Sequence, residues 1–318
     1  MATAEQIKSL IKSHLQDDSE RFVTTALQLA AYEAHKGHTT LARDIRYLID
    51  KQKSKQLKLV SFHKDLSDFI HSSKSQHRLS DIILKPELKG RVNKILKEYY
   101  QRQKLLRYGL SNRRKILLAG PPGTGKTMTA SVIAGELKLP FFTIQMDKIV
   151  TKFMGETSAK LRQVFDTIQN SEGVFLFDEF DAIGSDRGRS DDVGEIRRVL
   201  NAFLQFIEKD QSKSIIVSAT NNMKILDKAL FRRFDDILYY ELPSKKETLR
   251  LIENRLASFL VNLDVQTLID STEGLSHAEI TQACYDSIKE AILEDKTMVS
   301  KELMINNLKN RKSVYNHK

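Results

Sequence analysis

Apolar residues recur at helical spacing through the first 58 residues of the chain. Two series carry the pattern: Phe22, Ala26, Leu29 and Ala30, and then Leu41, Ile45 and Leu48. Gly37 lies between the two series, where a turn is expected. Residues 1–58 are therefore predicted to form an all-α N-terminal module. It carries no catalytic constellation, so we expect it to dock a partner. The polar, serine-containing segment 59–80 is predicted to be a linker.

The pattern changes near residue 115, where short apolar runs begin to alternate with helical stretches. Five runs are predicted strands: Lys115–Ala119, Phe141–Gln145, Val174–Asp178, Ser214–Ala219 and Ile237–Glu241. Strands that alternate with helices indicate an α/β domain, here residues 81–243, with a parallel five-stranded sheet covered on both faces. After Pro243 the pattern is purely helical, so residues 244–318 are predicted to form a small helical lid with a basic tail.

Composition and charge narrow the class of protein. No apolar run approaches the ~20 residues that span a bilayer, the first residues lack the apolar core of a signal peptide, and the single cysteine, Cys284, agrees with a reducing cytoplasm. The net charge is +10, and residues 85–115 hold eleven Lys or Arg against two acids. This segment is either a solvated helix face or a surface for nucleic acid or another anionic partner. The lack of a groove-reading motif favours the solvated face and leaves nucleic acid open.

The most specific motif is Gly120-Pro121-Pro122-Gly123-Thr124-Gly125-Lys126-Thr127, which directly follows the first predicted strand. A strand, a glycine-rich turn and a helix in this order predict a P-loop, in which backbone N–H groups and a helix N-terminus surround phosphates. Lys126 is expected to reach the β- and γ-phosphates of ATP. The Thr127 hydroxyl is expected to bind Mg²⁺.

Three other strand ends carry polar residues suited to phosphate chemistry. Asp178 ends a wholly apolar strand and is expected to hold Mg²⁺ opposite Thr127, while Glu179 is expected to activate the attacking water. Asn221 follows the next strand and is a candidate for positioning that water. Arg232 and Arg233 are candidates for stabilising the charge of the transferring phosphoryl group.

In this order the motifs resemble the AAA+ ATPases, over roughly residues 79–295. The similar group includes katanin-like and spastin-like severing enzymes, protease-linked unfoldases and bacterial stand-alone members. The resemblance implies Walker A at 120–127, Walker B at 174–179 and sensor 1 at Asn221. It implies that Arg232 and Arg233 act on the ATP of a neighbouring subunit, and hence a ring, normally a hexamer. It also implies nucleotide contacts from Met128, Asp81, Ile82, Gly274, His277 and Ala278.

The chain departs from the family pattern around the expected base of the nucleotide. Ile83-Leu84 stands where a glycine pair usually follows Asp81-Ile82, which puts the adenine contact there in doubt. His277 replaces a glycine of the lid motif, where it either contacts or crowds the nucleotide or caps the helix. Arg255 occupies about the position of the usual adenine-side histidine.

Lys152-Phe153-Met154 matches the family's first pore loop, in which an aromatic residue grips the substrate in the central channel. The sequence thus predicts an ATP-hydrolysing ring motor that unfolds or threads a polypeptide. The resemblance to bacterial stand-alone members adds a possible subtilisin-like partner protease in a defence or toxin–antitoxin system. Two alternatives stay open: a nucleic-acid-associated remodeller that uses residues 85–115, and a nucleotide-gated regulator of a partner enzyme.

Overall fold

The computed structural model describes two compact units of the chain, Met1–Ser61 and Phe62–Lys318. The described residues are 4–15, 19–56, 69–152, 156–183, 190–223, 228–260 and 263–316. No helix among them combines the length and the apolar character that crossing a membrane requires.

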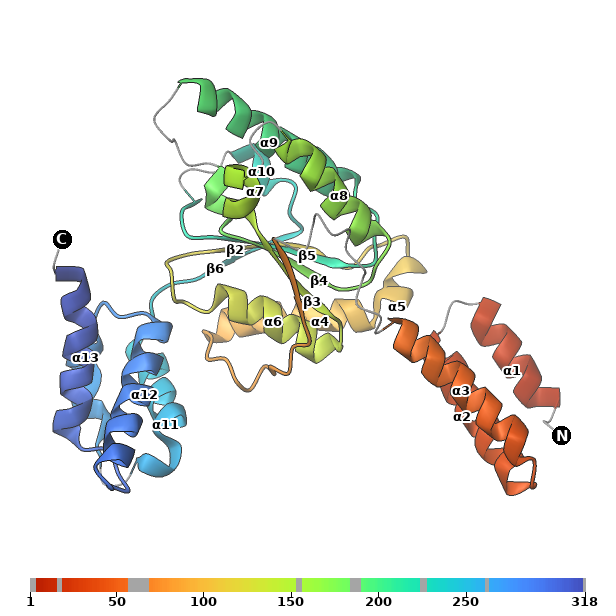
Figure 1. Ribbon diagram of the computed structural model, residues 1–318, viewed down its shortest axis with the longest axis horizontal. Helices are drawn as coiled ribbons and strands as arrows, with labels where there is room; N and C mark the ends of the chain where they lie inside the picture. The colour runs from red at the N-terminus through yellow and green to blue at the C-terminus, as the bar shows by residue number, and fades with distance from the viewer. Residues whose placement is uncertain are drawn as a thin grey trace. The chain divides into compact units, whose positions relative to one another are not determined.

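The described residues of the first unit form three helices (Figure 1). They are α1 (Ala4–Leu15), α2 (Ser19–His35) and α3 (Thr39–Gln56). The central helix α2 packs against both of its neighbours, and Ala26, Ala30 and Ile49 are buried. The predicted all-α character of this module is confirmed, while its docking role stays a prediction.

The second unit is built on a six-stranded, mostly parallel sheet with the order β1-β3-β4-β5-β2-β6. The strands are β1 (Ile70–Ser73), β2 (Lys115–Ala119), β3 (Phe141–Gln145), β4 (Val174–Asp178), β5 (Ile215–Thr220) and β6 (Asp236–Tyr239). The α/β class is confirmed, but the prediction of five strands was wrong by one. The extra strand is β1, which pairs antiparallel with β3 at the sheet edge and lies within the segment 59–80 that was predicted to be a linker.

Helices cover both faces of this sheet (Figure 1). They are α4 (Pro86–Tyr100), α5 (Arg102–Leu106), α6 (Lys126–Leu137), α7 (Met146–Lys152), α8 (Thr157–Gln169), α9 (Ser190–Lys209) and α10 (Lys228–Phe231). Apolar side chains of α4 and α6 pack on one face of β2, β4 and β5, in a core that includes Ile95, Ile133 and Val217. Because the central strands are buried on both faces, they are continuous apolar runs rather than alternating ones.

An aromatic cluster fills the core between the opposite face of the sheet and α8 and α9. The Phe203 ring of α9 lies 5.1 Å from Phe177 and 4.6 Å from Phe180, measured between ring centroids. Phe165 of α8 completes the cluster, with its ring centroid 5.6 Å from that of Phe203. Phe177 lies in β4 directly before Asp178, which ends the strand, so this core supports the edge of the sheet where the candidate catalytic residues lie.

Phe203→Ala is expected to lower the free energy of unfolding of this unit by about 3–5 kcal/mol, because it leaves a cavity in a fully buried aromatic cluster. Urea denaturation followed by circular dichroism measures the change. Phe206→Ala on the same helix is the matched control, and its loss should be clearly smaller because Phe206 is only half-buried. A loss below about 1 kcal/mol for Phe203→Ala would contradict the cluster's role.

The helical lid follows the sheet and has its own apolar core, which includes Ile252, Leu268, Ile280 and Met304. Its helices are α11 (Lys245–Leu256), α12 (His277–Leu293) and α13 (Lys301–Asn316), with 3₁₀ turns at Ala257–Phe259 and Val265–Thr272. Ser244 and Ser276 begin α11 and α12 with complete capping boxes, which fix where both helices start.

Candidate active site

The glycine-rich loop lies between the end of β2 and the start of α6. Gly120, Gly123 and Gly125 have φ angles of 152°, 72° and 95°, a region that side chains with a Cβ rarely adopt. At Gly120 a Cβ atom would also lie 2.3 Å from the backbone oxygen of Tyr240, so the loop passes too close to β6 for any larger residue. Gly125 is the N-cap of α6, which directs the free N–H groups of that helix into the loop.

Lys126 begins α6 and turns its side chain back into the loop. Its ammonium donates hydrogen bonds to the backbone oxygens of Gly120 and Pro121, at 2.7 and 2.8 Å. Burial lowers the pKa of Lys126, while the carboxylates of Asp178 and Asp181 oppose that shift. A phosphate group that enters the loop would offer this ammonium a charged partner in place of two neutral carbonyls.

The structure brings Thr127 and Asp178 together across the edge of the sheet. The Thr127 hydroxyl donates to Asp178 Oδ2 at 3.0 Å, and the Asp178 Oδ1 atom accepts from the backbone N–H of Glu179 at 3.0 Å. A hydroxyl and a carboxylate are hard oxygen donors of the kind that Mg²⁺ prefers. The two side chains therefore suit the predicted metal position, directly beside the loop expected to hold phosphates.

Glu179 has a strained backbone, with φ at 54°. A non-glycine residue in this region costs on the order of 1–3 kcal/mol and persists only where its surroundings hold it. Here Asp178 precedes it in β4 and the fully buried Phe180 follows it. Burial of its carboxyl group and the nearby carboxylates of Asp147, Asp178 and Asp181 raise the pKa of Glu179. Glu179 is thus a strained residue with a perturbed carboxyl group at the sheet edge, as is common at functional sites.

Asn221 is held at the same edge by a residue that the sequence reasoning missed. The backbone N–H of Asn221 donates to Asp181 Oδ1 at 3.1 Å. Asp181 lies three residues after Asp178. This position, just beyond the acidic end of the strand, was the one sign in the sequence that Asp181 belongs to the site. The contact itself joins segments 40 residues apart and was not visible in the sequence.

Ile82 contacts the glycine-rich loop at Gly125. Ile82 is buried, and its Cδ1 atom lies 3.4 Å from the position of a Cβ on Gly125. The Arg255 guanidinium of the lid donates to the backbone oxygen of Asp81 at 3.4 Å. The structure therefore places Arg255 beside Asp81, where the family resemblance predicted a residue on the adenine side.

The start of α12 touches the glycine-rich loop directly. The backbone N–H of Ala278 donates to the Gly123 oxygen at 3.0 Å, and a Cβ on Gly123 would lie 2.4 Å from Ser276 Oγ. Ser276 caps the helix, so His277 does not. Both ring nitrogens of His277 are buried without a hydrogen-bond partner among the described residues, and burial lowers its pKa. Gly274, with φ at 82°, turns the chain into this helix.

Arg232 and Arg233 follow α10 and are both exposed. Arg233 pairs with Glu208 of α9, its Nε atom 3.1 Å from Oε2. Among the described contacts, no arginine reaches residues 120–127 of the same chain. The structure does not bring this pair into the site of its own chain.

The roles of the pore-loop residues, of two prolines of the glycine-rich loop and of Met128 stay predictions. Phe153 and Met154 lie outside the described residues, as does the side chain of Lys152. Pro121 and Pro122 are exposed, and Met128 of α6 is half-buried. These positions leave them accessible for the predicted contacts with a nucleotide.

No sequence pattern pointed to Tyr240, which follows β6. Its hydroxyl donates to Thr129 Oγ1 at 2.7 Å, and its backbone N–H donates to the Ala119 oxygen at 2.7 Å. Both side chains are buried. Tyr240 therefore ties β6 to both ends of the glycine-rich loop, through the strand before it and the helix after it.

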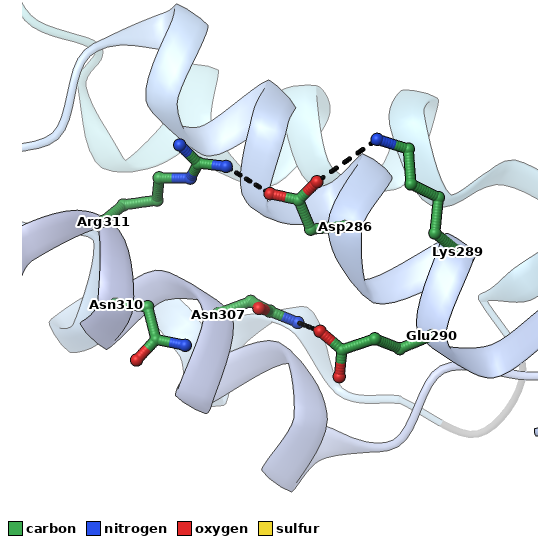
Figure 2. A pocket seen from close by; sticks show the side chains of 6 residues that line it. All are labelled: Asp286, Lys289, Glu290, Asn307, Asn310 and Arg311. Atoms are coloured by element: carbon green, nitrogen blue, oxygen red, sulfur yellow. Dashed lines mark hydrogen bonds and ion pairs between the residues drawn. The ribbon is translucent and has the colours of Figure 1, made fainter. Parts of the chain in front are cut away.

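A hollow of about 380 Å³ lies apart from this site, between α12 and α13 of the lid (Figure 2). Its lining comprises Asp286, Lys289, Glu290, Asn307, Asn310 and Arg311. Arg311 and Lys289 both pair with Asp286, and the Asn307 amide donates to Glu290. These ion pairs and the hydrogen bond link α13 to α12. The charged groups that take part in them are therefore already paired within the lid.

Comparison with known proteins agrees with this geometry. Residues 116–242 match the family described as "ATPase family associated with various cellular activities (AAA)". The chain is also 33% identical over 306 residues to an uncharacterized AAA family ATPase, y4kL, of Sinorhizobium fredii, an alignment that covers 94% of this chain and 92% of the relative. The matched region spans the glycine-rich loop, the acidic strand end, Asn221 and the arginine pair.

Proposed function

The chain belongs to the AAA family of ATPases, and on that premise we propose that it is a ring-forming motor that uses ATP hydrolysis to remodel or thread a polypeptide. Hydrolysis of ATP is the activity of the family. The observation that supports the assembly part of the proposal is the exposed Arg232, which has no ion pair among the described residues and no described contact with the loop of its own chain. An arginine so placed is available to the site of a neighbour.

In this proposal the glycine-rich loop and Lys126 bind the phosphates, and Thr127 and Asp178 would hold Mg²⁺. The ion would supply positive charge that neutralises the phosphate oxygens. Glu179 accepts a proton from the attacking water, and Asn221, held by Asp181, orients it. Arg232 and Arg233 of the adjacent subunit stabilise the charge that develops on the transferred group. Arg233 must leave Glu208 to do so.

The lid is the element that would convert the nucleotide state into movement. Its helix α12 hydrogen-bonds to Gly123 within the loop, so any change in the loop acts on the lid through a direct contact. The Asp81-Ile82 segment, Arg255 and His277 are the candidates for contacting the base. In the proposed cycle, movement of the lid against the sheet displaces the pore loop that contains Phe153.

Phe153→Ala separates polypeptide threading from the alternatives. We expect this variant to keep basal hydrolysis within about twofold. It should lose the stimulation that a permanently unfolded, labelled polypeptide gives the unchanged protein, because non-directional aromatic contact is what grips the chain. Tyr239→Ala, which removes another exposed aromatic, is the matched control and should keep the stimulation.

A nucleic-acid role would give a different outcome. In that case single-stranded DNA, not polypeptide, would stimulate hydrolysis, and the effect would fade as salt is raised. A nucleotide-gated regulator would respond to neither probe.

A further inference from the structure

Tyr240 places a hydroxyl group inside the apolar core that α4 and α6 form with the sheet. It directly follows β6, and its side chain is 4% exposed, whereas the neighbouring Tyr239 is 54% exposed. A phenylalanine ring would fill the same space and need no hydrogen-bond partner, while a buried hydroxyl without a partner is costly. What the hydroxyl of Tyr240 contributes must therefore come from the group that it bonds.

This hydroxyl begins a short chain of hydrogen bonds. Tyr240 Oη donates to Thr129 Oγ1 at 2.7 Å, and Thr129 Oγ1 donates to the backbone oxygen of Gly125 at 3.0 Å. Burial raises the pKa of Tyr240, so its hydroxyl remains a neutral donor. Thr129 is fully buried, and hydrogen bonds linked in this way inside a protein strengthen one another. The chain runs from the end of β6 to the glycine that begins α6.

The Gly125 oxygen belongs to the peptide that joins the glycine-rich loop to α6. Besides the Thr129 hydroxyl, it accepts the backbone N–H of Thr129 at 2.8 Å. Gly125 has a φ angle of 95° and is the N-cap of the helix, so its backbone is otherwise among the freest in the loop. Because the peptide is planar, two hydrogen bonds to this oxygen also fix the direction of the Lys126 N–H. That N–H is one of the free donors at the start of α6.

The backbone of Tyr240 restrains the other end of the loop. Its N–H donates to the Ala119 oxygen at 2.7 Å, in the last residue of β2. Its carbonyl lies so close to Gly120 that a Cβ on that glycine would be 2.3 Å away. One residue outside the loop therefore contacts the strand that enters it and, through Thr129, the helix that leaves it.

We infer that Tyr240 is a positioning residue for the nucleotide. Acting through Thr129, its hydroxyl holds the peptide between Gly125 and Lys126 in the orientation that binds phosphate. The inference rests on the proposed placement of the phosphates in the glycine-rich loop, and it adds a residue that does not touch them. The loop holds the phosphates both before and during the reaction, so the hydroxyl should contribute to binding rather than to the chemical step.

Tyr240→Phe removes this hydroxyl and leaves the ring. The KM for ATP and the dissociation constant of a fluorescent ATP analogue are expected to rise about five- to tenfold, the effect typical of one hydrogen bond, while kcat stays within about twofold. Steady-state phosphate release and fluorescence titration measure these quantities. Tyr239→Phe removes the hydroxyl of the adjacent, exposed tyrosine and is the matched control, which should change none of them.

Variants of Thr129 test the path of the effect. Thr129→Val replaces the hydroxyl by a methyl group and should raise KM at least as much as Tyr240→Phe. Thr129→Ser retains the hydroxyl and should keep KM within about twofold of the unchanged protein. Because Tyr240 acts through Thr129, adding Tyr240→Phe to Thr129→Val should raise KM no further.

A purely structural role for the hydroxyl would give a different pattern. The midpoint of urea denaturation would fall in Tyr240→Phe, while KM and the dissociation constant of the analogue would stay within about twofold. That result overturns the inference. A double variant in which the two effects multiply overturns it as well, because the two hydroxyls would then act independently.

Failure of the proposed function is recognised separately. If Lys126→Ala binds the fluorescent analogue as tightly as the unchanged protein, the phosphates do not lie in the glycine-rich loop. If polypeptide threading fails its own test with Phe153→Ala, the change expected in Tyr240→Phe still stands, because KM for ATP is measured without polypeptide.

Discussion

Glu179→Gln is expected to lower kcat for ATP hydrolysis by about 10²–10⁴-fold, because the amide cannot accept a proton from the attacking water. The dissociation constant for ATP should change by less than about threefold, since the phosphates are held by the loop and Lys126 rather than by Glu179. Steady-state phosphate release and titration with a fluorescent ATP analogue measure the two quantities. Glutamine has the same size as glutamate, so the strained backbone at φ 54° should be unchanged in the variant. The experiment therefore tests the carboxylate alone.

The matched control for this prediction is Glu253→Gln on the exposed face of α11, which should leave both quantities unchanged. Normal hydrolysis by Glu179→Gln would refute the assignment of Glu179 as the base. Asp181→Asn provides a second comparison, because it weakens the contact that holds Asn221 without removing the base. Its effect on kcat should be smaller than that of Glu179→Gln.

Arg232→Ala is expected to lower kcat by about 10³–10⁵-fold, the loss typical of an arginine that neutralises transition-state charge. Nucleotide binding should persist, because Arg232 has no described contact with the loop of its own chain, and assembly should persist, because the substitution removes a single exposed side chain. Phosphate release, ATP titration and sedimentation measure the three properties. Arg250→Ala, an exposed arginine of the lid, is the matched control.

Complementation tests whether Arg232 acts across subunits. Arg232→Ala and Lys126→Ala should each be inactive alone. In a mixture, a Lys126→Ala subunit can offer its intact Arg232 to the intact loop of an Arg232→Ala neighbour. Part of the hydrolysis should therefore return. Recovery would be absent if Arg232 served only its own chain.

Much of the sheet could be predicted because its strands carry their own signal. The limits of β2, β3 and β4 coincide with the apolar runs in the sequence, since strands buried on both faces need continuous apolar residues. The edge strand β1 could not be predicted in the same way. This strand, Ile70–Ser73, is short and its residues are mostly polar. It is recognisable as a strand only through its pairing with β3.

In the candidate site, too, some contacts could be predicted from the sequence and others could not. The meeting of Thr127 and Asp178 follows from motif spacing, because parallel strands bring their carboxyl ends to one edge. The contacts of Asp181 with Asn221, and of Ser276 and Ala278 with Gly123, join distant segments that no local pattern connects. Likewise, the basic segment 85–115 could not be divided into paired and free cations until its distant acidic partners were located.

Helix α12 has one end on the glycine-rich loop, where Ala278 contacts Gly123, and the other at the exposed Leu293. At 1.5 Å per residue, its 17 residues form a rod about 25 Å long. Over this length, a tilt of the helix by only about 5° about the Gly123 contact would move Leu293 sideways by about 2 Å. A small rearrangement around the phosphates is thus amplified at the far end of the lid.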